Sequence, residues 1–344
     1  MKYSFANDYS EGCHPSILKA FADTNNEQQA GYGDDNYSIN VRDTIRRLSD
    51  SPDAEVYMVG GGTMANLVVL SSMLKPFESV VAATSGHIYV NEAGAIEATG
   101  HKVEAAPSLD GKLRPEDIKP FLNKARGCHV VRTRAVYISN ATELGTVYTK
   151  QELTSLSGFC KENDLLLFMD GARLPMALVA SSNDLTLSDI ASLTDAFYIG
   201  GTKCGALSGE AIVITNPQLK VDFRYHLKQR GALAAKGRTI GIQFSQLLQD
   251  NLIFDLARHA NKMAIKIAEA FNASGYPLLI DTETNQVFAI LPNEFIYILK
   301  ERYDFLIWDI VDDNHSVIRL ITSWATPENI VDDFVKYLDK IKSK

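Results

Sequence analysis

The sequence predicts an α/β protein in which helices cover a mostly parallel β-sheet and a smaller α+β unit follows. Between residues 50 and 215, short apolar runs alternate with helical patterns, which is typical of consecutive βα units. After this region, a long helical pattern leads into short strands and a final amphipathic helix. Because 344 residues exceed the size at which a single core stops growing, we expect two domains. The large one covers residues 1–238, including an amino-terminal arm, and the small one covers residues 239–344.

The individual elements follow from the same patterns. The expected strands of the sheet are 55–59, 79–84, 135–140, 165–170, 195–201 and 209–215, and the expected helices between them are 63–74, 91–99 and 149–163. The basic segment 223–238 looks like a connector that leaves the sheet. The second domain is expected to contain helices over 239–272, 293–302 and 327–340 and strands over 286–291, 305–310 and 316–324.

Composition and charge favour an enzyme of small-molecule metabolism. The chain is 46% hydrophobic and 22% charged, which is ordinary for a globular protein, and its net charge of −8 argues against a nucleic-acid or anionic-membrane surface. The four cysteines are widely spaced without a CxxC pair, so we expect neither a metal site nor a disulfide framework. The amino terminus lacks the apolar stretch of a secretory signal, and the longest uncharged run contains three consecutive glycines. We therefore expect a cytoplasmic protein.

A glycine-rich turn predicts an anion site. In EVYMVGGGTMANL, Gly60, Gly61 and Gly62 lie between an expected strand and an expected helix, so bare backbone N–H groups face the same point as the positive end of the helix. The stretch also satisfies the GxGxxA pattern of dinucleotide-binding folds, but the acid expected at the end of the next strand is absent, because SVVAATS ends in neutral residues. A monophosphate fits better than a dinucleotide, and a tight turn needed only for packing stays an alternative.

Two further residues lie at the carboxyl ends of expected strands. The apolar run LLLFMD stops at Asp170, with Arg173 three residues beyond it, and carboxyl edges are where open α/β sheets bind ligands. Lys203 follows the strand DAFYIGG and lies among glycines with no acid nearby in the sequence. A lysine held in a partly dry cleft has a lowered pKa and can attack a carbonyl group. Taken singly, Asp170 could be a helix cap and Lys203 a surface residue.

Together, these residues provide what pyridoxal 5′-phosphate requires. The lysine forms the Schiff base, the acid keeps the pyridine nitrogen protonated, and the glycine turn holds the phosphate. A carboxylate that faces a pyridinium is a paired charge, which costs less to bury than a lone one.

In these residues and the motifs around them, the chain resembles the low-specificity L-threonine aldolase group, within the beta-eliminating lyase family of fold-type-I pyridoxal phosphate enzymes. The resemblance extends over nearly the whole chain and depends on the order and spacing of several motifs. These are YGDD at 32–35, GGGTMAN at 60–66, SGHIYVNEAGA at 85–95, HVVRTRAVYISN at 129–140, MDGARLPMA at 169–177 and GGTKCGA at 200–206.

The resemblance implies a role for each matching residue. Lys203 would carry the cofactor, Asp170 would pair with the pyridine nitrogen, and His87 would stack on the ring. His129 would be a second active-site histidine that helps to deprotonate the substrate hydroxyl. The phosphate would be bound by Gly61, Gly62 and Thr63, and the substrate carboxylate by Arg173 and Arg319. Arg238 would contact the cofactor phosphate of a neighbouring subunit.

The implied activity is cleavage of L-threonine, L-allo-threonine and related β-hydroxy amino acids to glycine and an aldehyde. A homodimer or homotetramer with active sites at the dimer interface is also implied. Where much of the family has ENTH, this chain has SNAT at Ser139–Thr142, so the acid and the histidine of that motif are both missing. Alternatives are another β-eliminating lyase, an aminotransferase, a nicotinamide-dependent oxidoreductase that uses the glycine turn, and a non-catalytic binding protein with the same fold.

Overall fold

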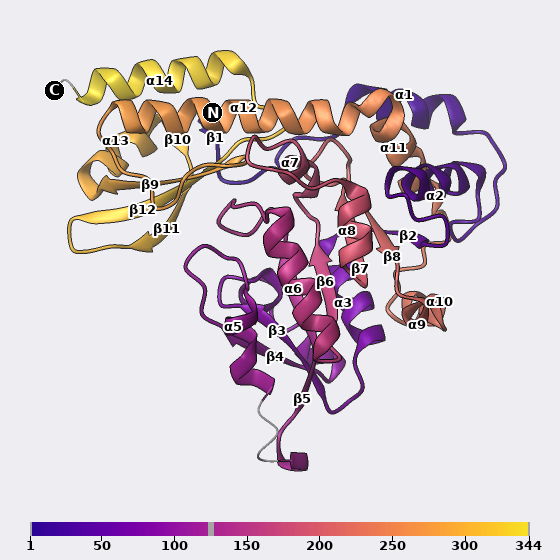
Figure 1. Cartoon of the computed structure of the whole chain (residues 1–344). Helices are drawn as coiled ribbons and strands as arrows, with labels where there is room; N and C mark the ends of the chain where they lie inside the picture. The colour runs from indigo at the N-terminus through magenta and orange to yellow at the C-terminus, as the bar shows by residue number, and fades with distance from the viewer. Residues whose placement is uncertain (1, 123–126, 343–344) are drawn as a thin grey trace.

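A seven-stranded, mostly parallel sheet forms the centre of the molecule in the computed structural model, which describes residues 2–122 and 127–342 (Figure 1). The strand order is β2-β8-β7-β6-β5-β3-β4, and β8 is antiparallel to both of its neighbours, whereas the other pairs are parallel. The strands are β2 (Glu55–Val59), β3 (Glu78–Ala83), β4 (Lys102–Ala106), β5 (Arg132–Ser139), β6 (Leu166–Asp170), β7 (Ala196–Gly200) and β8 (Glu210–Ile214). The predicted fold class is confirmed.

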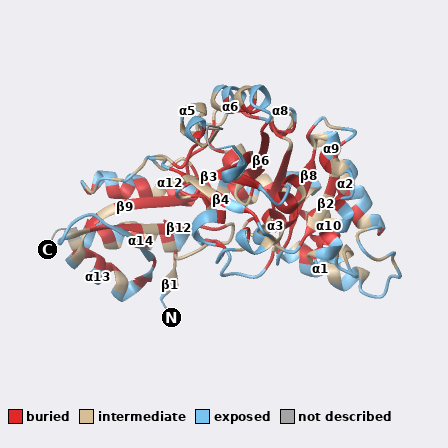
Figure 2. Cartoon of the chain, turned by 90° about the horizontal axis from the view of Figure 1, so that it is seen from below, coloured by how far each residue is buried: buried red, intermediate tan, exposed pale blue. Residues whose placement is uncertain are grey.

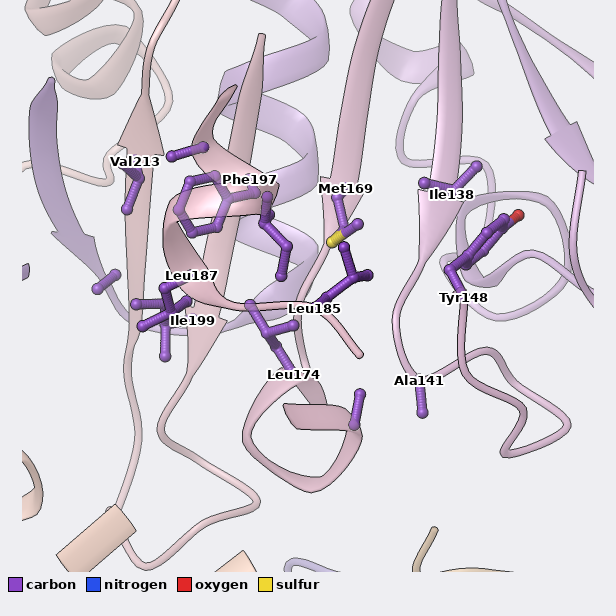
Figure 3. Close-up of a cluster of buried hydrophobic side chains, with 14 of the residues drawn as sticks. Ile138, Ala141, Tyr148, Met169, Leu174, Leu185, Leu187, Phe197, Ile199 and Val213 are labelled. Atoms are coloured by element: carbon purple, nitrogen blue, oxygen red, sulfur yellow. The ribbon is translucent and has the colours of Figure 1, made fainter. Parts of the chain in front are cut away.

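Helices cover both faces of this sheet because its strands are apolar on both sides. Successive residues belong to opposite cores: Val81 packs with one cluster and Val80 with the other. The first face is covered by α6 (Lys150–Glu162) and α8 (Leu187–Leu193), and the opposite face by α3 (Gly62–Met73) and α10 (Phe223–Gln229). In the first cluster, side chains from four neighbouring strands point to the same face (Figure 3): Ile138, Met169, Phe197 and Val213. The strands of the large sheet are accordingly among the most buried parts of the chain (Figure 2).

A three-stranded antiparallel sheet with its own core follows. Its order is β11-β12-β9, formed by β9 (Gln286–Pro292), β11 (Leu306–Ile310) and β12 (His315–Ile321). Its helices are α12 (Leu252–Ala273), α13 (Asn293–Arg302) and α14 (Glu328–Lys342). The amino-terminal strand β1 (Tyr3–Ser4) pairs with β10 (Tyr303–Asp304), so the first residues of the chain lie against this part. The domain boundary expected at residue 238 remains a prediction.

The structure corrects two of the expected helices. The helix expected over 239–272 is divided into α11 (Arg238–Leu248) and α12, because Asp250 and Asn251 adopt positive φ angles of 50° and 61°. The segment expected as a helix over 91–99 contains Ala93 and Gly94 at positive φ and is helical only as a 3₁₀ turn at its end. Strand β4 was not predicted.

The remaining helices are α1 (Pro15–Thr24), α2 (Asn36–Leu48), α4 (His87–Val90), α5 (Pro115–Ile118), α7 (Leu174–Leu178) and α9 (Pro217–Lys220). None of the helices in the two described ranges combines the length and the apolar character needed to cross a membrane.

Candidate active site

A cavity of about 240 Å³ lies at the carboxyl edge of the large sheet, where several strands end. Asp170 is the last residue of β6 and Ser139 the last of β5, and the two are paired directly across the sheet. Lys203 follows β7, and all three side chains line the cavity. The sheet therefore brings together residues that are distant in sequence, as the carboxyl edge of an α/β sheet does in general.

The carboxylate of Asp170 is held in a fixed position by four donors. Tyr137 donates to Oδ2 at 2.6 Å, and Tyr198 donates to Oδ1 at 2.5 Å. The Asn66 amide reaches Oδ2 at 3.1 Å, and the backbone N–H of Ala172 reaches Oδ1 at 2.9 Å. A carboxylate held in this way in the lining of a cavity fits the partner of a protonated ring nitrogen, whose charged N–H is a stronger donor than a phenol.

Lys203 provides an amine without a partner. No hydrogen bond or ion pair to its Nζ occurs among the described residues, although the side chain lines the cavity. Burial lowers the pKa of Lys203 below its usual value, and the nearby positive charge of Arg173 lowers it further. An amine in this state is a nucleophile for a carbonyl group, which fits covalent attachment of an aldehyde cofactor.

The glycine turn opens into the same cavity. Gly61 precedes the first residue of α3 and makes no side-chain cap, so the first N–H groups of a 12-residue helix lie at the cavity without a capping side chain. A Cβ atom added to Gly60 or Gly61 would meet no atom within 4 Å, so a side chain there would fill open space. Thr63 also lines the cavity. This geometry fits a phosphate group.

His87 lies at the start of α4 and contributes another wall. Its Nδ1 lies 2.7 Å from Oε1 of Glu92, which also accepts a hydrogen bond from Asn66 at 2.7 Å. Since Asn66 contacts Asp170 as well, one chain of hydrogen bonds fixes both the histidine ring and the carboxylate. The two groups proposed to face the cofactor are therefore positioned by the same amide.

Arg173 forms a buried ion pair that the sequence did not suggest. Its Nε donates to Oδ2 of Asp8 at 2.7 Å and its Nη2 to Oδ1 at 3.1 Å, and the Asn285 amide also contacts Asp8 at 2.9 Å. Burial opposes the charge of Arg173, but Asp8 raises the pKa of the guanidinium above its usual value. No hydrogen bond to Nη1 occurs within the described ranges, so this nitrogen remains available to a substrate anion.

Arg319 lies on β12, in the second sheet, with its guanidinium 4.7 Å from the centre of the Trp308 ring. Its Nε is buried and has no partner among the described residues. Burial lowers the pKa of Arg319 to about 10, and the charge of Arg173 contributes to that shift. Arg319 does not line the cavity itself. A buried guanidinium without a carboxylate partner is suited to binding a substrate anion.

Two more predicted site residues, besides Arg319, do not line the cavity. His129 is exposed at the amino-terminal end of β5, opposite to the end that forms the cavity, so the structure does not bring it to the site of its own chain. Its neighbours line a larger cavity of about 570 Å³, which contains none of the predicted site residues. Arg238 begins α11 and donates to the backbone carbonyl of Glu27 at 2.7 Å, also outside the cavity. The expectation that His129 is a second active-site histidine therefore gains no support from the position of this residue in its own chain, and it stays a prediction.

Several buried carboxylates and tyrosines at or near the cavity were not predicted from the sequence. Glu143 lines the cavity, and its Oε1 accepts hydrogen bonds from Ser139 Oγ at 2.7 Å and from the backbone N–H of His87 at 2.9 Å. Glu210 lines it as well and accepts from the backbone of Gly201 and the hydroxyl of Thr202, and burial raises its pKa to about 8. A carboxylate one residue beyond SNAT was a visible signal for Glu143. Nothing local indicated Glu210, Asp8, Tyr137 or Tyr198.

Comparison with known proteins agrees with this geometry. The family model described as "Beta-eliminating lyase" matches residues 6–294. The chain is 36% identical to a low specificity L-threonine aldolase of Pseudomonas aeruginosa over 94% of this chain and 93% of the relative. It superimposes on a threonine aldolase of Leishmania major with a TM-score of 0.97 and 49% identity, covering 99% of both chains. An aromatic aminotransferase of Pyrococcus horikoshii, at 15% identity and a TM-score of 0.73, covers 99% of this chain and 95% of its own and shares the fold alone.

Proposed function

The chain belongs to the beta-eliminating lyase family, whose members depend on pyridoxal phosphate, and we propose that it is a carbon–carbon lyase of the threonine aldolase type. It would cleave L-threonine, L-allo-threonine and related β-hydroxy amino acids to glycine and an aldehyde. The observation that carries this proposal is the unpartnered amine of Lys203 in a cavity that also contains Asp170 and the start of α3.

Each of the predicted cofactor-binding residues would contact a different part of pyridoxal phosphate. Lys203 would attach it covalently, Asp170 would pair with the ring nitrogen, and His87 would lie against the ring. When bound, pyridoxal phosphate draws electrons away from the α-carbon of an amino acid and so weakens the bonds of that carbon. The phosphate would be held at the N-terminus of α3 by Gly61, Gly62 and Thr63.

Two arginines would orient the substrate. Nη1 of Arg173 and the guanidinium of Arg319 would bind the α-carboxylate, one from the large sheet and one from β12. Asp8 would keep Arg173 in place, because its two hydrogen bonds fix the plane of the guanidinium. The α-carbon would then be held at a constant position relative to Lys203, which is an orientation effect.

We propose that the protein forms a homodimer or homotetramer, in which Arg238 contacts the cofactor phosphate of a neighbouring subunit. Support comes from the position of Arg238 outside the cavity of its own chain. A cytoplasmic location is part of the same proposal.

The products of the reaction test the proposed function against its alternatives. Purified protein loaded with pyridoxal phosphate should convert L-threonine to equal amounts of glycine and acetaldehyde. Release of ammonia with a keto acid would instead indicate β-elimination, and consumption of a keto acid co-substrate would indicate transamination. Either result would contradict the proposal while leaving the fold unchanged.

A further inference from the structure

Glu143 is a carboxylate of the cavity that the proposed roles do not use. It is 9% exposed, and its Oε1 is occupied by Ser139 Oγ and the backbone N–H of His87. No hydrogen bond from another residue in the described ranges reaches Oε2, and that oxygen is not one of the buried atoms left without a partner. Oε2 is therefore open to the cavity that Glu143 lines.

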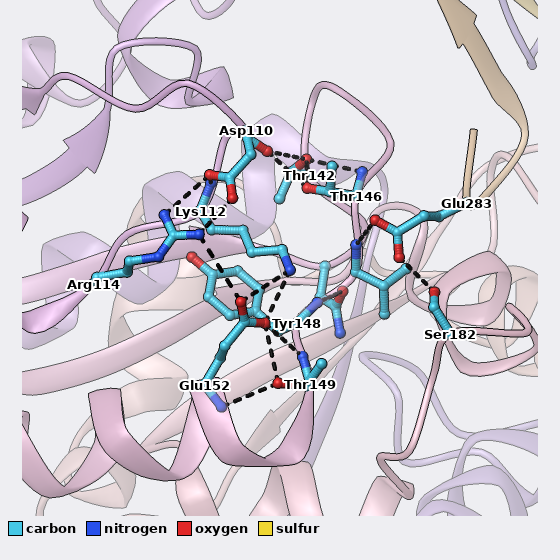
Figure 4. A network of polar contacts seen from close by, with 12 residues as sticks. Asp110, Lys112, Arg114, Thr142, Thr146, Tyr148, Thr149, Glu152, Ser182 and Glu283 are labelled. Atoms are coloured by element: carbon cyan, nitrogen blue, oxygen red, sulfur yellow. Dashed lines mark hydrogen bonds and ion pairs between the residues drawn. The ribbon is translucent and has the colours of Figure 1, made fainter. Parts of the chain in front are cut away.

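The position of this carboxylate is fixed by its loop. The hydroxyl groups of Thr142 and Thr146, one on each side of Glu143, lie 2.7 Å apart, and Thr146 Oγ1 donates to the backbone carbonyl of Asp110 at 2.7 Å (Figure 4). From the second sheet, the Gln286 amide donates to the backbone carbonyl of Thr142 at 3.2 Å. Thr284 donates to the carbonyl of Gly145 at 2.8 Å. Contacts from two separate parts of the chain thus hold the turn in which Glu143 lies.

The neighbours of Glu143 place it on the substrate side of the cavity. It lines the same cavity as Arg173, the proposed ligand of the substrate carboxylate, and its charge contributes to the raised pKa of that guanidinium. Burial raises the pKa of Glu143 itself, and the charge of Asp170 adds to this. It also contacts the residue that replaces the acid of the ENTH pattern, since Ser139 Oγ donates to it. Glu143, four residues later, thus brings a carboxylate next to the serine that replaces the acid at position 139.

We propose that Oε2 of Glu143 accepts a hydrogen bond from the β-hydroxyl group of the amino-acid substrate and selects β-hydroxy amino acids over analogues that lack this group. This inference rests on the proposed function, because it assumes that the α-carboxylate is held by the two arginines. A site with an acceptor in place discriminates strongly, because a ligand without the hydroxyl leaves a buried polar group without a partner. Glu143 would contact the substrate but not the cofactor.

Binding of L-serine and L-alanine provides the test, because the two ligands differ only by the hydroxyl group. Each is titrated into the cofactor-loaded protein, and the dissociation constant is read from the change in the visible spectrum. The wild-type protein should prefer serine, and Glu143→Ala should reduce the ratio of the two constants by about tenfold or more, the effect of losing a hydrogen bond to a charged group. Glu143→Gln should reduce it less, with unchanged affinity for the cofactor and for glycine.

A relocated acid provides the matched control. In the double variant Ser139→Glu with Glu143→Ala, the carboxylate returns to the position it has in the ENTH pattern, and the preference for serine should be partly restored. An unchanged ratio in both single variants would overturn the inference, as would equal losses for serine, alanine and glycine, which would indicate a purely structural role. Absence of any spectral response in the wild type would overturn it as well. If the ratio changes but threonine yields no acetaldehyde, the contact stands and the proposed function fails.

Discussion

Asp8 and Arg173 are joined by two hydrogen bonds, of 2.7 and 3.1 Å, although 165 residues separate them in the sequence. Asp8 comes from the amino-terminal arm, and Arg173 lies just beyond the end of β6. Both side chains are almost completely buried. The arm therefore contributes to the geometry of the cavity, and the pair connects the stability of the protein with the placement of a proposed substrate ligand.

Replacing Asp8 by Asn should destabilise the protein strongly. The variant leaves the buried charge of Arg173 without a counter-charge, which typically costs about 3–5 kcal/mol. Urea unfolding measures this difference, and Asp255→Asn is the control because Asp255 pairs with Arg258 on the surface, where such pairs contribute about 0–1 kcal/mol. Similar changes in the two variants would contradict a special role of the buried pair.

The contribution of Asp8 should also depend on pH in a defined direction. Burial alone would raise the pKa of Asp8, but the charges of Arg173 and Lys203, together with the hydrogen bonds from Arg173 and Asn285, outweigh burial and lower that pKa below its usual 3.8. The stability from the pair is then fully present above pH 3.8 and is lost as the pH falls through the lower value in the folded state. The stability difference between wild type and Asp8→Asn should decrease below that pH.

Replacing Arg319 by Met should weaken substrate binding without lowering the free energy of unfolding. Arg319 has a buried Nε without a partner, so removing its charge should leave the free energy of unfolding unchanged or slightly increased. The loss of one charged ligand should raise the KM for threonine about tenfold or more. Steady-state kinetics and the cofactor absorbance measure the two effects, and Arg302→Met, at an exposed arginine, is the control. A lower cofactor content with an unchanged KM would contradict the assigned role.

Glu210 should make the cofactor-free protein less stable as the pH rises. Burial raises its folded-state pKa from 4.5 to about 8, so between these pH values the unfolded chain releases a proton that the folded protein retains. Each pKa unit of difference contributes about 1.4 kcal/mol. In urea unfolding, Glu210→Gln should therefore gain stability relative to wild type between pH 5 and pH 8. A constant difference across this range would show that Glu210 ionises normally in the folded state.

The regular part of the fold could be predicted because it depends on local pattern. Strand β6 is apolar on both sides and is preceded by a clear helical pattern, and α13 was predicted with the bounds that the structure has. The break between α11 and α12 was missed, because two consecutive residues at positive φ, Asp250 and Asn251, leave no clear sign in a helical pattern. The spacing of apolar residues shows which segments can form helices or strands, but it shows less clearly where such a segment is interrupted.

The candidate site could be predicted only where motifs mark it. Lys203, Asp170 and the glycine turn were found from residue type and strand position, and the structure places them around one cavity. Asp8 and Glu210 could not be found, because their roles depend on contacts between segments that are distant in sequence or on burial. The motif that contains His129 extends along a whole strand, so it could not show that the histidine lies at the opposite end of β5 from the cavity.

The assignment of Lys203 as the cofactor-binding lysine is tested most directly by trapping the bound cofactor. The protein loaded with pyridoxal phosphate is reduced with borohydride and digested, and its peptides are analysed by mass spectrometry. The added mass of the reduced cofactor should lie on Lys203, and Lys203→Ala should lack both this label and the visible absorbance band. A label on a different lysine, or a band that persists in Lys203→Ala, would contradict the assignment.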